Sequence, residues 1–502
     1  MTGLLFPPRG ALRSLRPHQE RALEALRASI SAGKRRPMLQ APTGFGKTLT
    51  AAWIIQMALD KGKRVAFVVP ALSLIDQTVE AFEAEGIHCV GVMQGIHPRT
   101  DRDQPVQVCS VQTLARRRRP EVDVVIIDEA HQLHKEPFKW MAACPEVLFI
   151  GLSATPWARG LGKHYNDLIV ASTTKDLIEK GCLSTFKVFA PSMPDLSGVS
   201  TVAGDYHEGE LAAACDTASL VGDVIETYLK RGVGRQTLCY AVNRAHAEHL
   251  KQRFLEAGVS AAYIDCFTDR FDRERIFDRF RVGEIRVICN VATLAVGLDL
   301  PMVSCIIDAK PTKSEMRFVQ TIGRGLRTAE GKDHLLILDH AGNHLRIGLV
   351  TDVHHERLDA GEPRKSDAAD KERKKPLPRL CEDCQAVLPH SARVCPECGK
   401  VREVRTEIEH RDGELIELGS RPTKRTAALT VLEQEEFHGE LRWIASVRGY
   451  ASGWAAHKFK ERFGLWPNDC QVRLATPREP SLKTKNWLRS RQIAFAKARA
   501  SG

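Results

Sequence analysis

The sequence predicts an α/β protein with two doubly wound, parallel-sheet lobes, followed by a small cysteine-containing module and a mostly helical, basic C-terminal segment. Short runs rich in Val and Ile alternate with longer stretches of helical periodicity, a pattern typical of parallel strands covered by helices on both faces. The alternation is interrupted once and then resumes, which indicates two lobes. The length of 502 residues suggests three or four units in all, because one domain holds roughly 100–200 residues.

The first lobe is expected over residues 1–190. Apolar runs bounded by turn residues predict buried strands at residues 37–40, 64–69, 106–110, 122–128 and 147–152. A helix over residues 48–61 should end at Gly62, because glycine commonly terminates helices.

A segment rich in Pro, Ser and Gly then interrupts the pattern, and residues 191–215 are expected to link the lobes. The second lobe is expected over residues 216–349, with strands at residues 236–241, 261–264, 286–290, 305–308 and 335–339. A charged stretch, residues 350–378, has too few apolar residues to form a core and is interpreted as a second linker.

Charge and composition restrict the class of partner. The formal net charge of +11 favours a polyanion such as nucleic acid. No apolar run is long enough to cross a bilayer, so we expect no membrane partner. The N-terminus lacks an apolar stretch of signal-peptide length, and most of the 14 cysteines are scattered singly as in reduced proteins. These features predict a cytoplasmic protein.

APTGFGKT, residues 41–48, follows a predicted strand and opens a predicted helix, which is the context of a phosphate-binding loop. Gly44 and Gly46 let the backbone approach phosphates, and successive N–H groups of the loop supply partial positive charge. Lys47 can reach the β and γ oxygens of ATP, and the Thr48 hydroxyl can bind Mg²⁺. Thr43 and Phe45 complete the predicted loop.

VVIIDEAH, residues 124–131, is an apolar strand that ends in two adjacent carboxylates. Asp128, at the tip of the strand, is placed to hold Mg²⁺. Glu129 is placed to take a proton from the attacking water. The spacing from the glycine loop favours catalysis over a simple helix cap.

These motifs and those that follow, in order from Leu15 to Arg327, resemble a superfamily 2 helicase of the DEAH-box type, which implies two RecA-like lobes and ATP hydrolysis. LRPHQ resembles the adenine-reading motif, which implies that Gln19 bonds the base with Arg16 beside it. VATLAVGLDLP resembles motif V, which implies Gly297 and Asp299 at the ATP site. The apolar residues 294–296 depart from the family pattern and put a backbone contact there in doubt.

The resemblance also implies the residues that contact nucleic acid and transmit movement. VVPALSLIDQ and SVQTL resemble the strand-contacting motifs of the first lobe, with Pro70, Gln112 and Thr113, and motif V adds Thr293. SATP resembles the motif that couples hydrolysis to movement. Its residues are Ser153, Ala154 and Thr155.

QTIGRGLR, residues 320–327, resembles motif VI, which implies a catalytic role for Gln320. Arg324 and Arg327 are three residues apart, so on a helical turn both face one way and can reach a γ-phosphate across a cleft. Such arginines stabilise the charge that develops during phosphoryl transfer. Two solvated arginines would be the better interpretation if this segment stood alone.

LCEDCQAVLPHSARVCPECGK contains two C-x-x-C pairs. Each pair forms a tight turn that directs two thiolates at one point, and four such sulfurs suit tetrahedral Zn²⁺. The predicted ligands are Cys381, Cys384, Cys395 and Cys398, in a ribbon over residues 379–402. The ion should be structural, because four sulfurs leave no open position. His390 is interpreted as a surface residue rather than a ligand.

The basic segment over residues 403–502 contains four of the chain's seven tryptophans. In it, Trp454, Lys458, Lys460 and Arg462, together with His457, interleave aromatic and basic groups, which suits base stacking with phosphate contact. An amphipathic helix that packs Trp454, Phe459 and Phe463 inward fits equally well. A helicase core followed by such a ribbon resembles the RadD group of bacterial DNA-repair helicase-like ATPases.

The function predicted from these features is a DNA-dependent ATPase that moves on or remodels single-stranded or branched DNA in repair or recombination, using ATP, Mg²⁺ and Zn²⁺. Recombination or single-strand-binding proteins are its expected partners, in a bacterial or phage-encoded setting. A motor subunit of a restriction or anti-phage system is one alternative, although no nuclease or methyltransferase motif is visible. A DNA-binding scaffold switched by ATP is another. RNA is disfavoured because the core and ribbon resemble DNA-repair proteins.

Overall fold

The computed structural model describes residues 12–291, 300–361, 376–402, 431–451 and 453–500, with side chains described up to residue 491. The chain divides into two compact units, residues 1–404 and residues 405–502, and each is described by itself. The predicted motif V residues Thr293, Gly297 and Asp299, and the apolar stretch at residues 294–296, lie outside the described residues.

Lobe 1 is built on a seven-stranded parallel sheet of order β3-β4-β2-β5-β6-β1-β7. Its strands are β1 (Pro37–Gln40), β2 (Val65–Val69), β3 (Val90–Met93), β4 (Val106–Ser110), β5 (Val124–Ile127), β6 (Leu148–Ser153) and β7 (Asp167–Val170). The five strands predicted from apolar runs are confirmed. The outermost strands β3 and β7 were not predicted, because β3 is interrupted by Gly91 and β7 is only partly buried.

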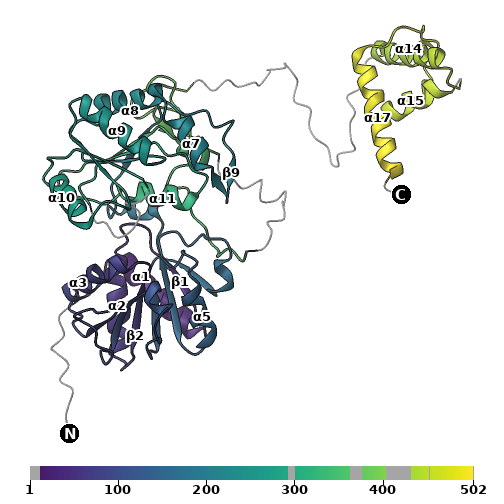
Figure 1. Cartoon of the computed structure of the whole chain (residues 1–502). Coiled ribbons are helices and arrows are strands. Elements are labelled where there is room, and N and C mark those ends of the chain that lie inside the picture. Colours follow the sequence, from purple (N-terminus) through teal and green to yellow (C-terminus); the bar gives the residue numbers. More distant parts are fainter. Residues whose placement is uncertain (1–11, 292–299, 362–375, 403–430, 452, 501–502) are drawn as a thin grey trace. The chain divides into compact units, whose positions relative to one another are not determined.

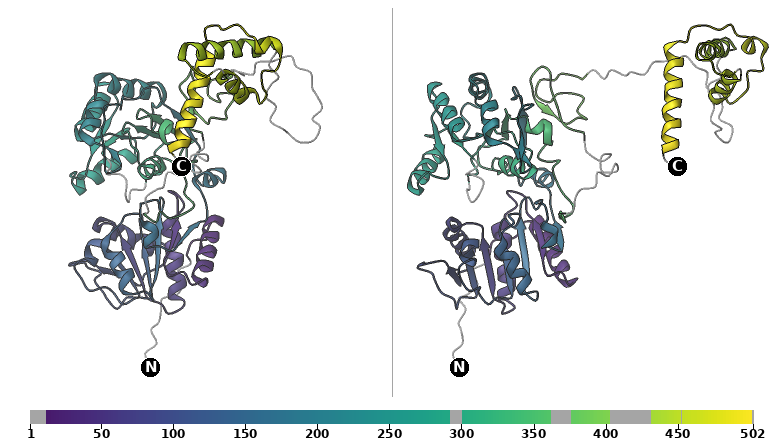
Figure 2. Two further views of the ribbon diagram at one scale, coloured as in Figure 1. Left: turned by 90° about the vertical axis from the view of Figure 1, so that its right-hand side faces the viewer. Right: turned by 45° about the vertical axis from the view of Figure 1, so that its right-hand side comes forward.

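Helices cover both faces of this sheet (Figure 2). They are α1 (Pro17–Ser31), α2 (Lys47–Leu59), α3 (Ile75–Ala84), α4 (Val111–Leu114), α5 (Lys135–Ala143) and α6 (Thr174–Glu179). Alternate side chains of β2 lie on opposite faces of the sheet. Val65, Phe67 and Val69 pack on the face covered by α1, α2 and α3, and Ala66 and Val68 pack on the face covered by α5. Burial on both faces explains why the strands are continuous apolar runs rather than alternating ones.

Lobe 2, drawn in teal to green in Figure 1, contains a six-stranded parallel sheet of order β12-β13-β11-β14-β15-β8. Its strands are β8 (Phe186–Phe189), β11 (Thr237–Tyr240), β12 (Ala261–Ile264), β13 (Val287–Asn290), β14 (Cys305–Asp308) and β15 (Leu335–Asp339). The five strands predicted for this lobe are confirmed. The expected lobe boundary at residue 190 is wrong, because β8 pairs with β15 of the second sheet.

The helices of lobe 2 are α7 (Glu208–Cys215), α8 (Ala218–Arg231), α9 (Arg244–Glu256), α10 (Arg270–Arg281), α11 (Glu315–Gly323) and α12 (Asn343–Ile347). Helices α8 and α9 pack on one face of the sheet, and α10 and α11 pack on the other. The expected linker at residues 191–215 contains a hairpin, β9 (Thr201–Val202) with β10 (Asp205–Tyr206), and helix α7.

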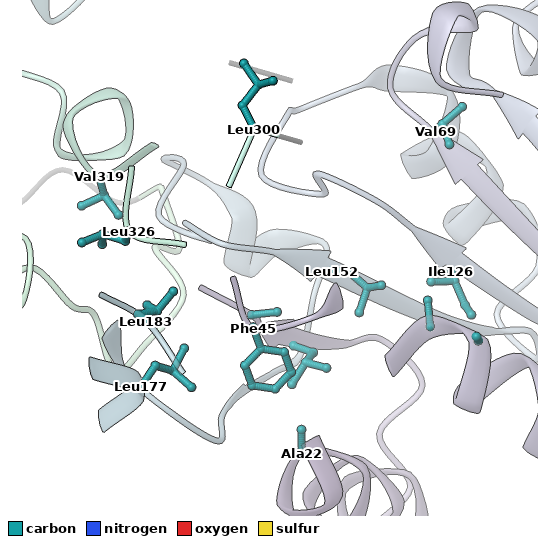
Figure 3. Packing of buried hydrophobic residues seen from close by; sticks show 14 of the residues in the cluster. Ala22, Phe45, Val69, Ile126, Leu152, Leu177, Leu183, Leu300, Val319 and Leu326 are labelled. Carbon is teal, nitrogen blue, oxygen red and sulfur yellow. The ribbon is translucent and has the colours of Figure 1, made fainter. Parts of the chain in front are cut away.

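One cluster of buried apolar side chains extends through both lobes (Figure 3). Phe45 and Leu152 belong to lobe 1, and Leu326 belongs to lobe 2. Leu177 of α6 and Leu183, in the segment that crosses between the lobes, lie in the same cluster. The lobes therefore share apolar contacts beside their connecting chain.

The cysteine module packs against lobe 2 and forms part of its core. Its strands β16 (Arg379–Leu380) and β17 (Val387–Leu388) pair in an antiparallel hairpin. Its apolar side chains share a buried cluster with Phe189 of β8. The Ala190 N–H donates to the Gln385 carbonyl over 3.1 Å, and the Arg231 guanidinium donates to the Cys384 carbonyl over 3.1 Å. The module is thus fixed to lobe 2 by main-chain and apolar contacts.

After α12 the chain returns to lobe 1, so part of the expected linker at residues 350–378 is packed. The Gly162 N–H donates to the Asp359 carbonyl over 2.8 Å. His355 lies with its ring 4.8 Å from that of Trp157, and its Nε2 is 2.7 Å from a carboxylate oxygen of Glu315 at the start of α11. This return segment, residues 350–361, therefore touches both lobes.

The second unit is helical, as predicted. Its helices are α14 (Val431–Arg448), α15 (Trp454–Phe463), α16 (Cys470–Arg473) and α17 (Leu482–Ala500). Their core is a small cluster that includes Phe437, Leu441, Phe459 and Val472. Within the described ranges of the chain, no helix has the length and apolar character required to cross a membrane.

Candidate active site

The loop between β1 and α2 has the backbone shape of a phosphate cradle. Gly46, the N-cap of α2, has φ of 89°, and Gly44 has φ of 82°. Both values lie in the left-handed region that favours glycine. A Cβ at Gly44 would collide with the Leu183 side chain, and one at Gly46 would collide with Gln19. The two glycines therefore provide both the turn and the space that the predicted loop requires.

Helix α1 supports this loop from the other side. The Gln19 side-chain amide donates to the Phe45 carbonyl over 3.0 Å and to the Gly46 carbonyl over 3.3 Å. Its oxygen accepts the Arg16 N–H over 2.8 Å. Gln19 thus connects the start of α1 to the phosphate loop. Arg16 and the residues of this loop line one cavity. Recognition of adenine by these two residues stays a prediction.

Lys47 lies against the two predicted carboxylates. Its ammonium forms an ion pair with Glu129 and lies 3.4 Å from Asp128. Burial lowers the pKa of Lys47, but the two negative charges outweigh burial and raise that pKa above its usual value. Burial also works against the Glu129 carboxylate, yet the charge of Lys47 and the hydrogen bond from it lower the pKa of Glu129 overall. Both groups are therefore charged at neutral pH.

Glu129 has an unusual backbone. Its φ is 46°, in the left-handed region that residues with a Cβ rarely adopt. Such a conformation costs of order 1–3 kcal/mol and persists where the surroundings hold it, which is common at active sites. The turn directly follows β5 and directs the Glu129 side chain toward Lys47.

A chain of hydrogen bonds joins the two lobes beside the carboxylates. Gln320 of α11 donates through its amide to Thr155 Oγ1 over 3.0 Å, and the same nitrogen is 3.2 Å from His131 Nε2. His131 Nδ1 in turn lies 2.9 Å from Ser153 Oγ. Burial lowers the pKa of His131, so the ring is neutral. It can accept from Gln320 at Nε2 while Nδ1–H donates to Ser153.

These contacts connect three predicted motifs. The Ser153 hydroxyl also accepts the Thr155 N–H over 3.0 Å, which fixes the predicted coupling segment, and Ala154 is buried within it. Residues at the ends of β5 and β6 in lobe 1 are thereby linked directly to Gln320 in lobe 2.

The predicted arginines face the same space. A cavity of about 780 Å³ is lined by the phosphate loop, Asp128 and Glu129 from lobe 1, and by Arg324 and Arg327 from lobe 2. The positive charge of Arg324 contributes to the lowered pKa of Glu129. The volume is within the range of small-molecule sites, about 300–1,000 Å³. Both arginines are therefore brought to the phosphate loop, as the sequence predicted.

Two close contacts that the sequence did not reveal align the lobes here. The segment around Leu183 forms a bridge with Arg327, and the Ser184 N–H donates to the Leu326 carbonyl over 2.7 Å. At the end of α11, a Cβ built on Gly323 would lie 2.7 Å from Thr43 Oγ1. Both contacts join positions far apart in the sequence. The local sign of such a close approach is the glycine at position 323 of QTIGRGLR.

The residues predicted to contact nucleic acid differ in how exposed they are. Pro70 and Thr113 are buried, and Gln112 is exposed with its amide donating to the Pro70 carbonyl over 3.2 Å. After α4 and its C-cap Ala115 follow four arginines, residues 116–119, of which the first three are exposed. This basic run was not singled out from the sequence, although four consecutive arginines are a visible signal.

The four paired cysteines lie together at one point. Their sulfur atoms are all within 4.8 Å of one another. Cys381 Sγ is 3.5 Å from Cys398 Sγ, and Cys384 Sγ is 3.6 Å from Cys395 Sγ. These separations exceed a disulfide bond, about 2.05 Å. They suit four sulfurs at about 2.3 Å around one tetrahedral Zn²⁺. The donor set therefore fits the predicted ion, and His390 is exposed outside it.

Two family models match the chain. Residues 13–158 match a model described as the type III restriction enzyme, res subunit, and residues 220–329 match the helicase conserved C-terminal domain. A 51.5 kDa protein of a Lactococcus phage is 28% identical over 82% of this chain and 88% of its own length. The Saccharomyces cerevisiae protein assigned as ATP-dependent helicase IRC3 is 29% identical over 65% of this chain, which spans about half (51%) of that relative.

Among solved structures, a fragment of a type I restriction enzyme HsdR subunit from Vibrio vulnificus superposes with a TM-score of 0.54. It is 18% identical to this chain and aligns with 70% of it and 68% of the fragment. At this level of identity the similarity shows the fold of the two lobes.

Proposed function

The chain belongs to the superfamily 2 helicases and is a nucleic-acid-dependent ATPase; on this premise we propose that it is a motor that moves on or remodels single-stranded or branched DNA. The observation that carries the proposal is the cavity between the lobes. It combines the phosphate loop and the carboxylate pair of one lobe with the arginines of the other. Because both lobes contribute residues to this site, its contacts with the nucleotide depend on the relative position of the two lobes.

The residues divide the work of hydrolysis. The phosphate loop holds the phosphates, and Lys47 exchanges its bond with Glu129 for the β and γ oxygens of ATP. Asp128 and Thr48 would hold Mg²⁺, which supplies positive charge at those oxygens. Glu129, released from Lys47, accepts a proton from the attacking water. Arg324 and Arg327 stabilise the charge that develops on the transferred phosphoryl group.

Closure of the lobes follows from differential binding. The γ-phosphate contacts both lobes only when the cavity is closed, so ATP favours the closed arrangement. Hydrolysis removes that contact and releases Gln320 and the arginines from the first lobe. Through its bonds to Thr155 and His131, Gln320 transmits the change in lobe position to the coupling segment. Movement of the lobes then changes their contacts with the strand.

Several features support DNA as the substrate. The net charge is +11, and exposed arginines follow α4. The model that matches the first lobe is described as a restriction-enzyme subunit. Contacts of motor lobes go mainly to phosphate and sugar, which position the protein without reading sequence. Pro70, Gln112 and Thr113 are proposed to lie along this path.

A restriction or anti-phage motor is the second candidate, favoured by the match of residues 13–158. It would need a partner that supplies the nuclease. A role in DNA repair rests on the resemblance to the RadD group. Recombination or single-strand-binding proteins are proposed partners. The phage relative supports a bacterial or phage-encoded origin, and a cytoplasmic location is part of the proposal.

Zn²⁺ is the proposed ion of the four-cysteine cluster. The sulfur positions support it, and burial of Cys381 and Cys395 in the apolar contact with lobe 2 indicates a structural ion. Such an ion would join the two C-x-x-C turns to each other through their sulfurs and so stabilise the hairpin of the ribbon against β8.

The test measures ATP turnover with single-stranded DNA, forked DNA and RNA in parallel. We expect both DNAs to stimulate turnover, and Glu129→Gln to retain ATP binding while turnover is lost. Absence of stimulation by every nucleic acid contradicts the motor, and stimulation by RNA alone contradicts DNA as substrate. A strand-displacement assay on the fork then separates unwinding from movement or scaffolding without unwinding.

A further inference from the structure

Two of the residues predicted to bind a strand, Trp454 and Arg462, pack in the core of the second unit. Trp454, Phe459 and Phe463 pack into the buried cluster. The Arg462 guanidinium lies 4.1 Å from the ring centre of Phe437, and burial lowers its pKa. Lys458 forms an ion pair with Glu461. The amphipathic interpretation is therefore correct for these residues, and they are not free to bind a strand.

A different tryptophan faces outward. Trp466 lies two residues after Gly464, which caps the C-terminus of α15 with φ of 75°, and Trp466 is 39% exposed. Lys460 Nζ lies 4.4 Å from its ring centre, and the His457 ring lies 5.0 Å away at a steep angle. The Asn468 N–H donates to the Trp466 carbonyl over 2.8 Å. The indole is thus held in place with cationic and imidazole groups around it.

A further aromatic ring lies at the other end of α15. Tyr450 is 38% exposed, and its ring centre is 4.6 Å from that of Trp454, with a tilt of 37°. His457 and Lys460 follow Trp454 at successive spacings of three residues, so they progress along one side of the helix. We name the outward-facing members of this set the α15 row: Tyr450, His457, Lys460 and Trp466, with Trp454 packed inward beside Tyr450.

The length and charge of the α15 row suit an extended polyanion. Ten residues of α15 span about 15 Å, at a rise of 1.5 Å per residue, which is enough for a few nucleotides. Residues 431–491 contain eleven Lys or Arg and seven Asp or Glu. The acidic Glu461 of α15 is already paired with Lys458, so its charge is offset beside the row.

We propose that the α15 row is a second nucleic-acid site that binds single-stranded DNA, with a base stacked on Trp466 and a phosphate beside Lys460. Stacking needs a base whose flat face is accessible, and a duplex covers those faces with neighbouring bases. Phosphate contacts alone would serve either form of DNA, so the exposed rings select the single strand. This site goes beyond the motor function, because it requires neither ATP nor closure of the lobes.

The site lets the chain keep hold of a strand through each cycle of lobe opening. Contacts of the motor lobes change with the nucleotide, whereas those of the α15 row do not depend on it. The row should also favour no particular sequence, because every base offers a face for stacking.

The experiment uses the full chain without nucleotide and a fluorescent oligo(dT) in an anisotropy titration. We expect Trp466→Ala to weaken binding by roughly tenfold, as for the loss of one stacked base, and Trp466→Phe to retain most of it. We expect Lys460→Gln to reduce the slope of log affinity against log salt by about 0.7, as for one lost contact to a single strand. Lys483→Gln, an exposed lysine of α17, is the matched control and should change the affinity less.

Ultraviolet crosslinking of oligo(dT) with peptide mapping locates the strand directly, and a crosslink on Trp466 is expected. Wild-type affinity in Trp466→Ala and Lys460→Gln, or preference for duplex DNA or RNA over single-stranded DNA, overturns the proposal. Equal melting temperatures and equal ATP turnover without DNA exclude misfolding of the variants. Loss of turnover in Lys47→Ala with intact binding at the α15 row would separate a failure of the motor from a failure of this site.

Discussion

Gly323→Ala should impair the motor without harming the fold. The added Cβ would lie 2.7 Å from Thr43 Oγ1 and 2.9 Å from Thr43 Cβ. Optimal separations between such atoms are about 3.5–4.0 Å, so α11 and the phosphate loop must separate locally by about 1 Å. Gly323 has no left-handed backbone, so alanine introduces no strain of its own.

The consequence for activity follows from what comes next in the chain. Arg324 directly follows Gly323, and Arg327 lies one turn further. A shift of about 1 Å in a catalytic group can lower a rate by about 100-fold. We therefore expect kcat for ATP to fall between about 10- and 100-fold. Stability should be unchanged or rise by up to about 1 kcal/mol, because alanine is favoured over glycine in a helix.

The assay compares DNA-stimulated ATP turnover and thermal unfolding with those of Gly222→Ala. Gly222 lies within α8, and a Cβ there meets no atom within 4 Å. The two variants make the same chemical change in a helix of the same lobe. Only the one at Gly323 meets the phosphate loop.

Turnover by Gly323→Ala at the rate of Gly222→Ala would refute this reasoning, since the contact between Gly323 and Thr43 would then not belong to the hydrolysing state. A large loss of stability in Gly323→Ala would also refute it, because the conflict would then lie within lobe 2.

Three further predictions concern lobe coupling, pH and the metal. Gln320→Leu removes the amide that bonds Thr155, and should lower turnover about tenfold while ATP binding persists, since each such bond contributes about 0.5–1.5 kcal/mol. Burial, and then the charge of a neighbouring aspartate, raise the pKa of Asp308 to about 7. Asp308 therefore binds its proton more tightly in the native state than in the unfolded state, so the free energy of unfolding should fall as pH rises from about 4 to 7. Denaturant titrations at several pH values should show a smaller slope for Asp308→Asn. Cys384→Ser should release bound zinc, measured by elemental analysis, and lower the melting temperature.

Each of the three has a control. An increase in the KM of Gln320→Leu without a change in kcat would place its role in binding rather than coupling. Equal pH slopes in wild type and Asp308→Asn would show that Asp308 does not titrate in this range. Cys470→Ser changes a cysteine outside the cluster and should leave the zinc content unchanged. A zinc content of Cys384→Ser equal to that of the wild type would exclude Cys384 as a ligand.

The sequence predicted the parts of the site that depend on local order. A strand, a glycine-containing loop and a helix follow one another at Lys47, and a strand precedes Asp128, so the positions of these residues could be read directly from the chain. The cysteine cluster was equally local, because its two turns carry their own spacing.

Features that depend on distant contacts could not be predicted in this way. Residues 186–189 have the apolar character of a strand, but nothing local shows that they join the second sheet. The fit of Gly323 against Thr43 depends on how the lobes meet. In α15 the helical period allowed Trp454 to face inward or outward, and the packing of α14 and α17 decided for the interior.

The attachment of the ribbon to β8 affects how the protein behaves in solution. β8 is the outermost strand of its sheet, and beyond it Phe189 bridges Ala386 while the Ala190 N–H bonds Gln385. An outermost strand without such cover offers unpaired N–H and C=O groups to other chains. The ribbon therefore shields lobe 2 from edge-to-edge self-association. A chain shortened to end before Arg379 should aggregate with increasing concentration, even though every residue proposed to contact ATP is retained.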